Sequence, residues 1–141
     1  MVTYGFEDVT VSFQHNGVGA ASSIGAGIGS ISISMTTDRT THNVAADGTI
    51  MVSKVAGKNG NMALEIQQNS ELHKWLVKWN NYIEISNSSE WAGMTITIKS
   101  SNLGDSTICT GVSPQKLPDR PYGAQGAMVT WQLMAAKITQ S

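Results

Sequence analysis

Apolar and polar residues alternate with a period of two in several separate segments, and this pattern constrains the fold more than any other feature of the chain. Successive side chains of a strand point to opposite faces, so such alternation predicts strands with one buried face. The alternation is clearest in four segments: residues 9–13, 31–35, 62–66 and 94–98. Three further segments are rich in β-forming residues but alternate less regularly: 49–55, 106–112 and 128–138. The sequence therefore predicts a mostly β chain.

One segment has helical spacing instead. Its apolar residues recur at intervals of three and four on one face: Leu72, Trp75, Leu76 and Trp79. Its other face is expected to be polar and exposed: His73, Lys74, Lys78 and Asn80. Asn69 or Ser70 can cap the first turn, and the helix is expected to run to about Asn81. Many strands and one helix predict a β-sandwich or barrel with the helix, about residues 69–81, packed against it.

The polar segment TTDRTTHNVAADG, within residues 35–50, is predicted to be a long protruding hairpin or a loop. Asp47-Gly48 is a pair that tolerates a tight hairpin turn. An isolated ribbon with few apolar side chains is marginal in water, so a hairpin here would need a neighbouring subunit to stabilise it. The charges of Asp38, Arg39 and Asp47 are either ordinary surface charges or a means of fixing the register between subunits.

Two segments lack clear periodicity. Residues 17–29, GVGAASSIGAGIG, are small and flexible and predict a loop or a frayed connection between strands. Pro114, Pro118 and Pro121 predict an irregular stretch before the last strand.

Composition points to an assembly subunit. With 141 residues the chain has the size of one domain. Its charged fraction of 13% is about half of the roughly 25% typical of soluble domains. A subunit covered by neighbours can replace charges with Ser, Thr, Asn and Gly. The nine Lys and Arg residues are scattered singly, which argues against a tightly held nucleic acid. The opening residues resemble no secretory signal, and no segment approaches the length of a membrane span.

No motif predicts an enzyme, a cofactor or a metal site. The glycine-rich segment matches neither phosphate-binding pattern. The three histidines belong to no metal or acid–base motif and are expected to be exposed: His15, His42 and His73. Cys109 is alone, which excludes an intrachain disulfide and favours synthesis in a reducing compartment, and it is expected to pack in the core. Trp75 and Trp79 could stack on bases or sugars, but their helical spacing favours the core.

Several stretches together resemble the tail tube proteins of contractile-tailed bacteriophages. They are the opening YGFEDVTVSF, the central DGTIMVSKVAGKNGNMALEIQQNSELHKWL and the final WQLMAAKI. The most specific part is the Asp-Gly-x-x-Met-x-Ser stretch at residues 47–53, followed by Gly57, Lys58, Gly60, a strand and an Asn-Ser helix start. The resemblance covers nearly the whole chain, so residues 1–141 are expected to form one tail tube domain.

The resemblance implies a structural subunit whose hexameric rings stack into a hollow tube, similar to the tubes of type VI secretion and of pyocin particles. It implies sheath, baseplate, tail-terminator and tape-measure proteins as partners, with DNA crossing the lumen without specific binding. It implies a protein made in the host cytoplasm that ends in the virion tail, with no membrane partner. It also places a set of candidate residues between rings: Asp38, Arg39, Thr40, His42, Asn43 and Asp47.

Two other functions fit the same residues less well. A carbohydrate- or ligand-binding β-sandwich would use the Trp side chains or the glycine-rich loop. A small hydrolase is a more distant alternative, because no catalytic triad can be assigned.

Overall fold

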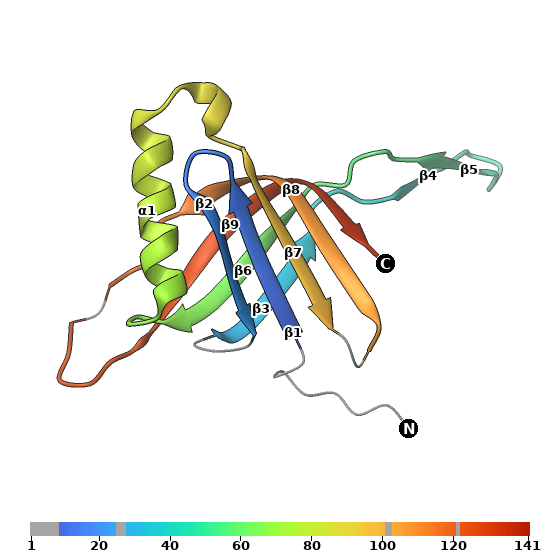
Figure 1. Cartoon of the computed structure of the whole chain (residues 1–141). Coiled ribbons are helices and arrows are strands. Elements are labelled where there is room, and N and C mark those ends of the chain that lie inside the picture. The colour runs from blue at the N-terminus through green and yellow to red at the C-terminus, as the bar shows by residue number, and fades with distance from the viewer. Residues whose placement is uncertain (1–8, 25–27, 101–102, 121) are drawn as a thin grey trace.

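The computed structural model describes residues 9–24, 28–100, 103–120 and 122–141. Strands dominate these residues, and one long α-helix, α1, interrupts them (Figure 1). In chain order the elements are β1 (Val9–His15), β2 (Gly19–Ile24), β3 (Ile28–Met35), β4 (Thr40–Val44), β5 (Ile50–Lys54), β6 (Gly60–Gln67), α1 (Glu71–Ile85), the 3-10 helix η2 (Ser88–Glu90), β7 (Met94–Ser100), β8 (Asp105–Lys116) and β9 (Met128–Gln140). All seven segments predicted to be strands therefore contain one.

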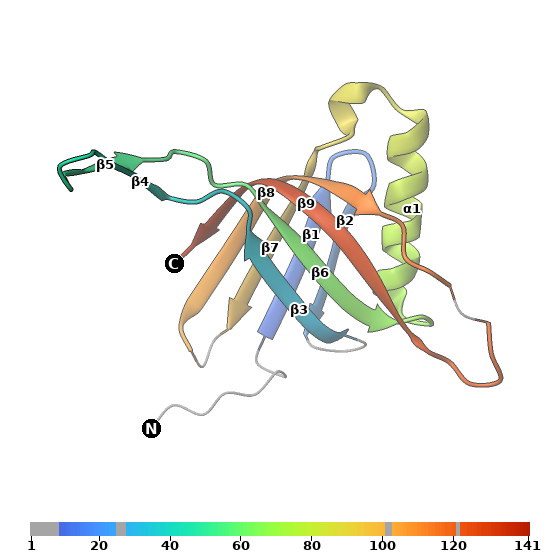
Figure 2. The same cartoon turned by 180° about the vertical axis from the view of Figure 1, so that it is seen from behind.

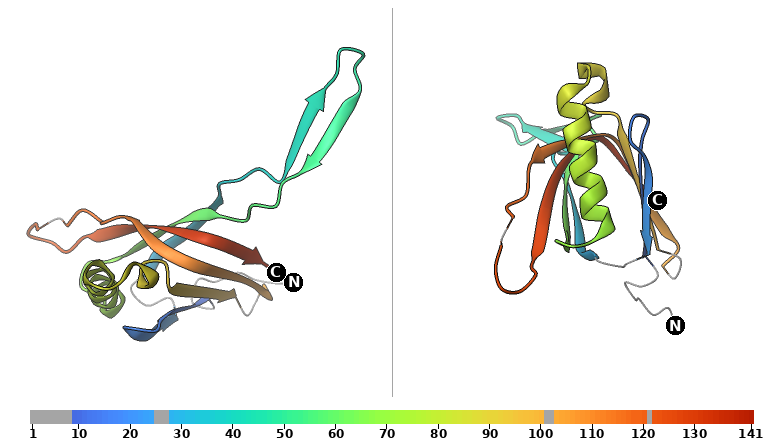
Figure 3. Two further views of the ribbon diagram at one scale, coloured as in Figure 1. Left: turned by 90° about the horizontal axis from the view of Figure 1, so that it is seen from above. Right: turned by 60° about the vertical axis from the view of Figure 1, so that its left-hand side comes forward.

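Seven strands form one antiparallel sheet in the order β2-β1-β7-β8-β9-β6-β3, while β4 pairs with β5 in a separate ribbon. The sheet curls around α1 into a half-barrel, with β9 on one flank and β1 and β2 on the other (Figure 3). The prediction of a mostly β fold with one packed helix is confirmed. The segment around residues 35–50 is the outgoing half of the β4–β5 hairpin, which projects away from the sheet (Figure 1).

The core fills the concave side of the half-barrel. Alternate residues of each long strand point there, as in β9, where Val129, Trp131 and Leu133 are buried. The cross-strand pairs Ile31–Leu64 and Leu64–Trp131 continue this layer across three neighbouring strands. Burying such side chains removes apolar surface from water, which is the main favourable contribution to folding.

A bulge helps the sheet to curl. In the β7–β8 ladder Met94 pairs with Val112, whereas Ile96 pairs with Cys109, so β8 has one residue more than β7 over this interval. Gly111 lies in the bulge with a φ of +65°, and a Cβ there would come within 2.7 Å of the Ala136 Cβ. A bulge bends its strand and increases local twist, and this one requires glycine.

Helix α1 begins after Ser70, whose side-chain oxygen accepts a 3.2 Å hydrogen bond from the His73 backbone N–H. The predicted cap is confirmed at Ser70 and not at Asn69. The helix ends at Ile85, four residues beyond the predicted end at Asn81. Ile83 is buried one turn after Trp79 and continues the apolar face, so packing extends the helix.

Two residues predicted on the exposed helix face, His73 and Asn80, are buried. The His73 Nδ1 accepts a 3.1 Å hydrogen bond from the Trp131 indole N–H. The Asn80 amide donates to Glu84 Oε1 at 3.2 Å. The curled sheet covers more of the helix than a flat one would, so both polar groups are enclosed, and each has a hydrogen-bond partner within the chain.

The prediction of an exposed His15 was also wrong. His15 ends β1 on the buried face, where its Nδ1 accepts a 3.0 Å hydrogen bond from the Gly17 N–H. Its Nε2 therefore carries the proton and donates to the Glu90 carbonyl oxygen at 3.0 Å. This imidazole joins the β1–β2 turn to η2. Of the three histidines, His42 is exposed as predicted.

Two predicted irregular segments are partly regular. Within residues 17–29, β2 pairs with β1 from Gly19 to Ile24, while residues 25–27 lie outside the described part of the chain. Pro114 lies within β8 opposite Leu133, next to a shift in register between residues 114 and 116, where a missing N–H is tolerated. The irregular stretch therefore starts at Leu117, and Pro121 lies outside the described residues.

Candidate assembly surfaces

The sheet has two open edges. β2 and β3 are its outer strands, and each pairs with only one neighbour. The backbone N–H and C=O groups on their free sides can pair with a strand of another molecule. Natural edge strands usually carry charges or Pro that prevent such addition, but β2 (GAASSI) and β3 (IGSISISM) contain neither. Both edges are therefore suited to strand addition.

The convex face of the sheet is polar but largely uncharged. Its side chains alternate with the buried ones along each strand: Thr10, Ser12, Gln14, Ser32, Ser34, Asn61, Thr95, Thr97, Ser113, Gln115, Thr130 and Gln132. Its charged exceptions are Glu65, Lys99, Lys116 and Lys137, the last two opposite Gln132 and Thr110. A surface made mainly of hydroxyls and amides provides hydrogen-bonding groups, and its few charges are spread over separate strands, so it has no row of cations that would match a polyanion.

The β4–β5 hairpin is exposed along its whole length, and every residue of both strands is solvent-accessible. Its turn is ordered. The Ala45 N–H donates to the Thr49 carbonyl at 2.8 Å, and Gly48 adopts a φ of +90°. The Asp47 carboxylate accepts a 3.0 Å hydrogen bond from the Thr49 N–H, and bonds from Thr49 lower the pKa of this carboxyl. Asp47 is therefore ionised at neutral pH.

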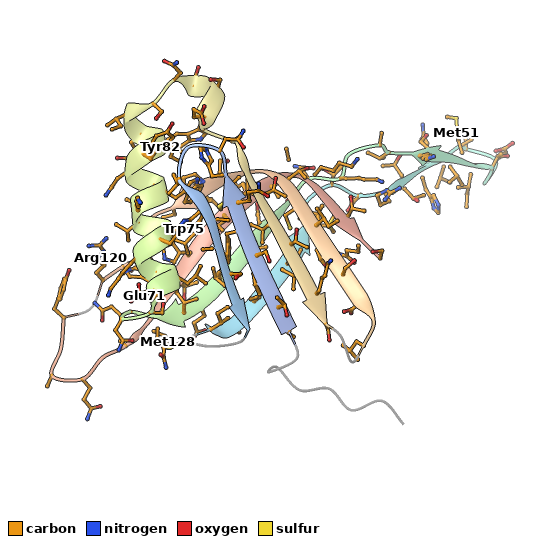
Figure 4. The ribbon with its side chains drawn as sticks, viewed as in Figure 1. Met51, Glu71, Trp75, Tyr82, Arg120 and Met128 are labelled. Carbon is orange, nitrogen blue, oxygen red and sulfur yellow. The ribbon has the colours of Figure 1, made fainter. Side chains whose placement is uncertain are left out.

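One face of the hairpin is apolar. Val44 pairs with Ile50, and His42 pairs with Val52, so these four side chains share a face. The exposed fractions of Val44, Ile50 and Val52 are 63%, 54% and 63%. On the other face Met51 lies opposite Asn43 (Figure 4). We call the set Val44, Ile50 and Val52 the apolar hairpin face.

The residues predicted to lie between rings all belong to this hairpin or its approach. Asp38 and Arg39 precede β4, Asp47 is in the turn, and three lie in β4: Thr40, His42 and Asn43. All six are exposed. Sequence reasoning missed the apolar contribution of β5, because residues 49–55 were treated as a separate strand. The signal was present, since Asp47-Gly48 is flanked by two β-prone segments of similar length.

The base of the hairpin is held to the sheet. The Thr36 N–H donates to the Asn59 carbonyl at 3.1 Å, and the Thr37 hydroxyl donates to the Asn59 side-chain oxygen. Higher up, the Val55 N–H donates to the Arg39 carbonyl at 2.8 Å. The two arms therefore leave the sheet side by side, and the hairpin projects as one unit.

A cleft of about 390 Å³ lies at the far end of the sheet, between the segment after β8 and the start of β9. Leu117, Pro118 and Met128 supply apolar surface, and the exposed fractions of Leu117 and Met128 are 51% and 38%. Lys116 and Arg120 supply positive charge, and Asp119 one negative charge. The β8–β9 ladder ends at the pair Lys116–Gln132, so residues 128–131 of β9 pair with no residue of β8.

The described residues show few features of a catalytic centre. Within them no group of three or more His, Cys, Asp or Glu side chains could hold a metal ion. Burial raises the pKa of the Cys109 thiol to about 11, which makes it a weak nucleophile, and its predicted place in the core is confirmed. Across the same residues, no helix combines the length and apolar character needed to cross a bilayer.

The geometry defines a class of protein: a β subunit with open sheet edges and a projecting arm, both of which are available for contact with other subunits. Comparison with known proteins agrees. A family model described as bacteriophage PhiTE tail tube protein matches residues 1–141, and the chain belongs to this family. It is a structural subunit of a tail tube, as the sequence predicted. The search of curated proteins found no sequence match.

Solved structures with the same fold come from contractile injection systems. The chain resembles a chain of the PVC sheath/tube terminator in its extended state, with 16% identity, a TM-score of 0.67, and coverage of 100% of this chain and 98% of that one. A chain of the PVC sheath-tube complex gives 17% identity, a TM-score of 0.61, and 99% and 91% coverage. A chain of the anti-feeding prophage tube-terminating cap gives 15% identity, a TM-score of 0.60, and coverage of 100% of this chain and 93% of that one. At such low sequence identities, the structural similarity shows a shared fold and no more.

Proposed function

We propose that the whole chain acts as one tail tube domain, without catalysis, in the inner tube of a contractile phage tail. Six copies form a ring, rings stack into a hollow tube, and DNA passes through the lumen during ejection. Partners are sheath, tail-terminator, baseplate and tape-measure proteins. The protein is made in the host cytoplasm and ends in the virion. The structural neighbours come from sheath-tube, tube-terminating cap and baseplate assemblies, which supports these partners.

The observation that carries the proposal is the pair of uncharged open edges. β2 and β3 lie at opposite borders of one sheet, so the β2 edge of one copy can meet the β3 edge of the next. Such a contact uses different surfaces on the two copies. Repeating it closes a ring when a whole number of copies completes a full turn. Ring closure pairs every edge and leaves none open to uncontrolled addition.

The convex face suits the wall of the channel. A basic lining would bind DNA phosphates through release of counterions and slow their passage. Hydroxyl and amide side chains dominate this face, and its lysines are scattered, which limits such binding. We therefore orient this face toward the lumen, with α1 and the opposite side of the sheet toward the sheath.

The hairpin is proposed to bridge rings. It projects from the sheet (Figure 2). Its side chains Val44, Ile50 and Val52 are each more than half exposed. The six predicted residues, Asp38, Arg39, Thr40, His42, Asn43 and Asp47, would lie in this contact. A head-to-tail contact between rings does not close, so it produces a filament of stacked rings.

The first experiment is electron microscopy of the purified protein, which should show rings or tubes. A monodisperse monomer at high concentration would count against the proposal. Hydrogen exchange followed by mass spectrometry tests the edges: amides of β2 and β3 should become protected on assembly, while β8, already paired on both sides, serves as the control. Equal exchange of β2 and β3 before and after assembly would reject edge pairing.

The second experiment removes the hairpin. Thr37 and Gly57 lie close enough that a Cβ on Gly57 would meet the Thr37 side chain, so a Gly-Ser-Gly link can replace residues 38–56. We expect this variant to fold and to form rings that do not stack. Tubes of normal length would reject the bridging role.

A ligand-binding module is not favoured. Trp79 is completely buried, and Trp75 packs against Phe13 with ring centroids 6.1 Å apart. Neither indole is therefore free to stack on a sugar or a base.

A further inference from the structure

The tip of the β4–β5 hairpin combines an apolar face with one negative charge. Val44, Ile50 and Val52 form the apolar hairpin face, and Asp47 is the one charged residue between residues 43 and 53. A surface with this composition is complementary to an apolar hollow bordered by cations.

The cleft after β8 has that composition. Leu117, Pro118 and Met128 give it apolar walls, while Lys116 and Arg120 outnumber Asp119 and leave it net positive. The hollow beside residues 67–69 and 126–128 fits less well, because it has no charged lining residue. The hollow beside Met35 is also bordered by cations, Arg39 and Lys58, but its volume is smaller, about 240 Å³.

The tip cannot reach the cleft of its own chain. Met128 begins β9, whereas Ala135 pairs with Gly60, where the chain re-enters the sheet after the hairpin. At a rise of about 3.4 Å per residue, the seven steps from 128 to 135 span about 24 Å. The hairpin then points away from the cleft: Met51 and the pair Arg120 and Met128 lie at opposite ends of the molecule (Figure 4). The tip and the cleft therefore meet only between copies.

We propose that the hairpin tip of one copy docks into the cleft of a copy in the next ring. The apolar hairpin face packs on Leu117, Pro118 and Met128, and the Asp47 carboxylate faces Lys116 and Arg120. This assignment rests on the proposed stacking of rings. It goes further by naming the surface that the hairpin contacts. It leaves the six-residue set between rings in place and adds the residues of the apolar hairpin face.

Disulfide trapping tests the contact. A variant with Ile50→Cys and Leu117→Cys should, after mild oxidation of assembled tubes, give a ladder of linked chains on non-reducing denaturing gels. Cys109 is buried and does not interfere. The matched control pairs Ile50→Cys with Ile85→Cys, whose native side chain at the end of α1 is 87% exposed, and it should give no ladder. A ladder from the control alone would overturn the proposal.

Charge exchange tests the chemistry. Asp47→Lys should raise the protein concentration needed for tube formation by about tenfold or more, because it brings like charges together. Arg120→Glu should weaken stacking similarly, and the double variant should recover tubes. Asp47→Asn keeps an acceptor for the Thr49 N–H, so it separates loss of charge from loss of the turn. Asp105→Lys, at the exposed start of β8 and outside both surfaces, should fail to rescue Arg120→Glu.

The outcomes distinguish failure of the docking contact from failure of the proposed tube function. If tubes form but neither the disulfide ladder nor the charge rescue is seen, the hairpin contacts a surface other than the cleft. The docking proposal is then wrong, while the tube function stands. If the unmodified protein forms neither rings nor tubes, the proposed function itself fails.

Discussion

The half-barrel and the β4–β5 hairpin are both built from antiparallel strands, but they differ in how far their side chains are buried. In the half-barrel, strands alternate buried and exposed side chains around a core that includes Leu64 and Trp131, both fully buried. In the hairpin, two five-residue strands pair in good register with every side chain exposed. A two-stranded ribbon of this kind is marginal by itself. The half-barrel has the means to fold alone, whereas in the proposed tube the hairpin gains its stability from contact with another copy.

This difference separates folding from assembly. Substitutions in the half-barrel should lower the free energy of unfolding of the single subunit. Substitutions in the hairpin should leave that free energy nearly unchanged and alter association.

The largest effect is expected from Leu64→Ala. It removes a fully buried side chain from β6, at the centre of the layer shared by three strands, and should lower the free energy of unfolding by about 2–5 kcal/mol. Val52→Ala on the hairpin should change it by less than about 0.5 kcal/mol. Urea denaturation of the unassembled subunit measures both values. Similar losses for the two variants would mean that the hairpin belongs to the folding unit.

A smaller effect is expected from Ser70→Ala. It removes the acceptor for the His73 N–H at the start of α1 and should cost about 1 kcal/mol of stability. Asp47→Asn in the hairpin turn is the comparison, because the amide oxygen can still accept from Thr49. Chemical denaturation should show a loss only for the Ser70 variant. No loss there would show that packing alone sets the helix start.

Acid should destabilise the half-barrel through His73. Burial, with a further contribution from the Arg120 charge, lowers the pKa of His73 from its ordinary value of 6.5. The unfolded chain then binds a proton more readily than the folded one. The free energy of unfolding therefore falls as the pH drops below 6.5, and this contribution levels off below the folded-state pKa.

His73→Gln retains an acceptor for the Trp131 indole and should make this fall shallower in denaturation curves recorded at several pH values. His42→Gln, on the exposed hairpin, should leave the slope unchanged. If the free energy of unfolding fell equally steeply with pH in the native protein and the His73 variant, His73 would not be the source of this pH dependence.

The smallest effect concerns thiol reactivity. With a pKa of about 11 and a buried side chain, Cys109 should have about one thiol in a thousand ionised at pH 8 and should react slowly with an alkylating reagent. A thiol introduced by Ile50→Cys on the hairpin should react at the rate of a free thiol. Mass spectrometry after timed labelling distinguishes the two, and denaturant should abolish the difference. Rapid labelling of native Cys109 would show that the core opens often.

Much of the fold was readable from local pattern. The alternation around residues 9–13 and 62–66 predicted β1 and β6, and the spacing of Leu72, Leu76 and Trp79 predicted α1. β2 was missed because GAASSI has small side chains and no alternation, so its pairing with β1 decides its conformation. His15 and His73 were expected outside because polar residues usually are, whereas each has a partner from a distant part of the chain.

The candidate site was predicted in part. The polar segment before Asp47-Gly48 was recognised as a hairpin candidate, and its six residues do lie together on one projecting arm. The cleft formed by Lys116, Leu117 and Arg120 beside Met128 was not foreseen. Its walls are eight or more residues apart along the chain and come together only because β8 and β9 pair.

The amino-acid sequence by itself determined where most strands and the helix form, because periods of two and of 3.6 residues are set by neighbours along the backbone. It also determined the low charge that suits a covered subunit. The tertiary structure decided the order of strands, and with it which two edges remain open, which polar side chains are enclosed, and that hairpin and cleft lie at opposite ends. These features depend on pairing between distant residues, which no local pattern encodes.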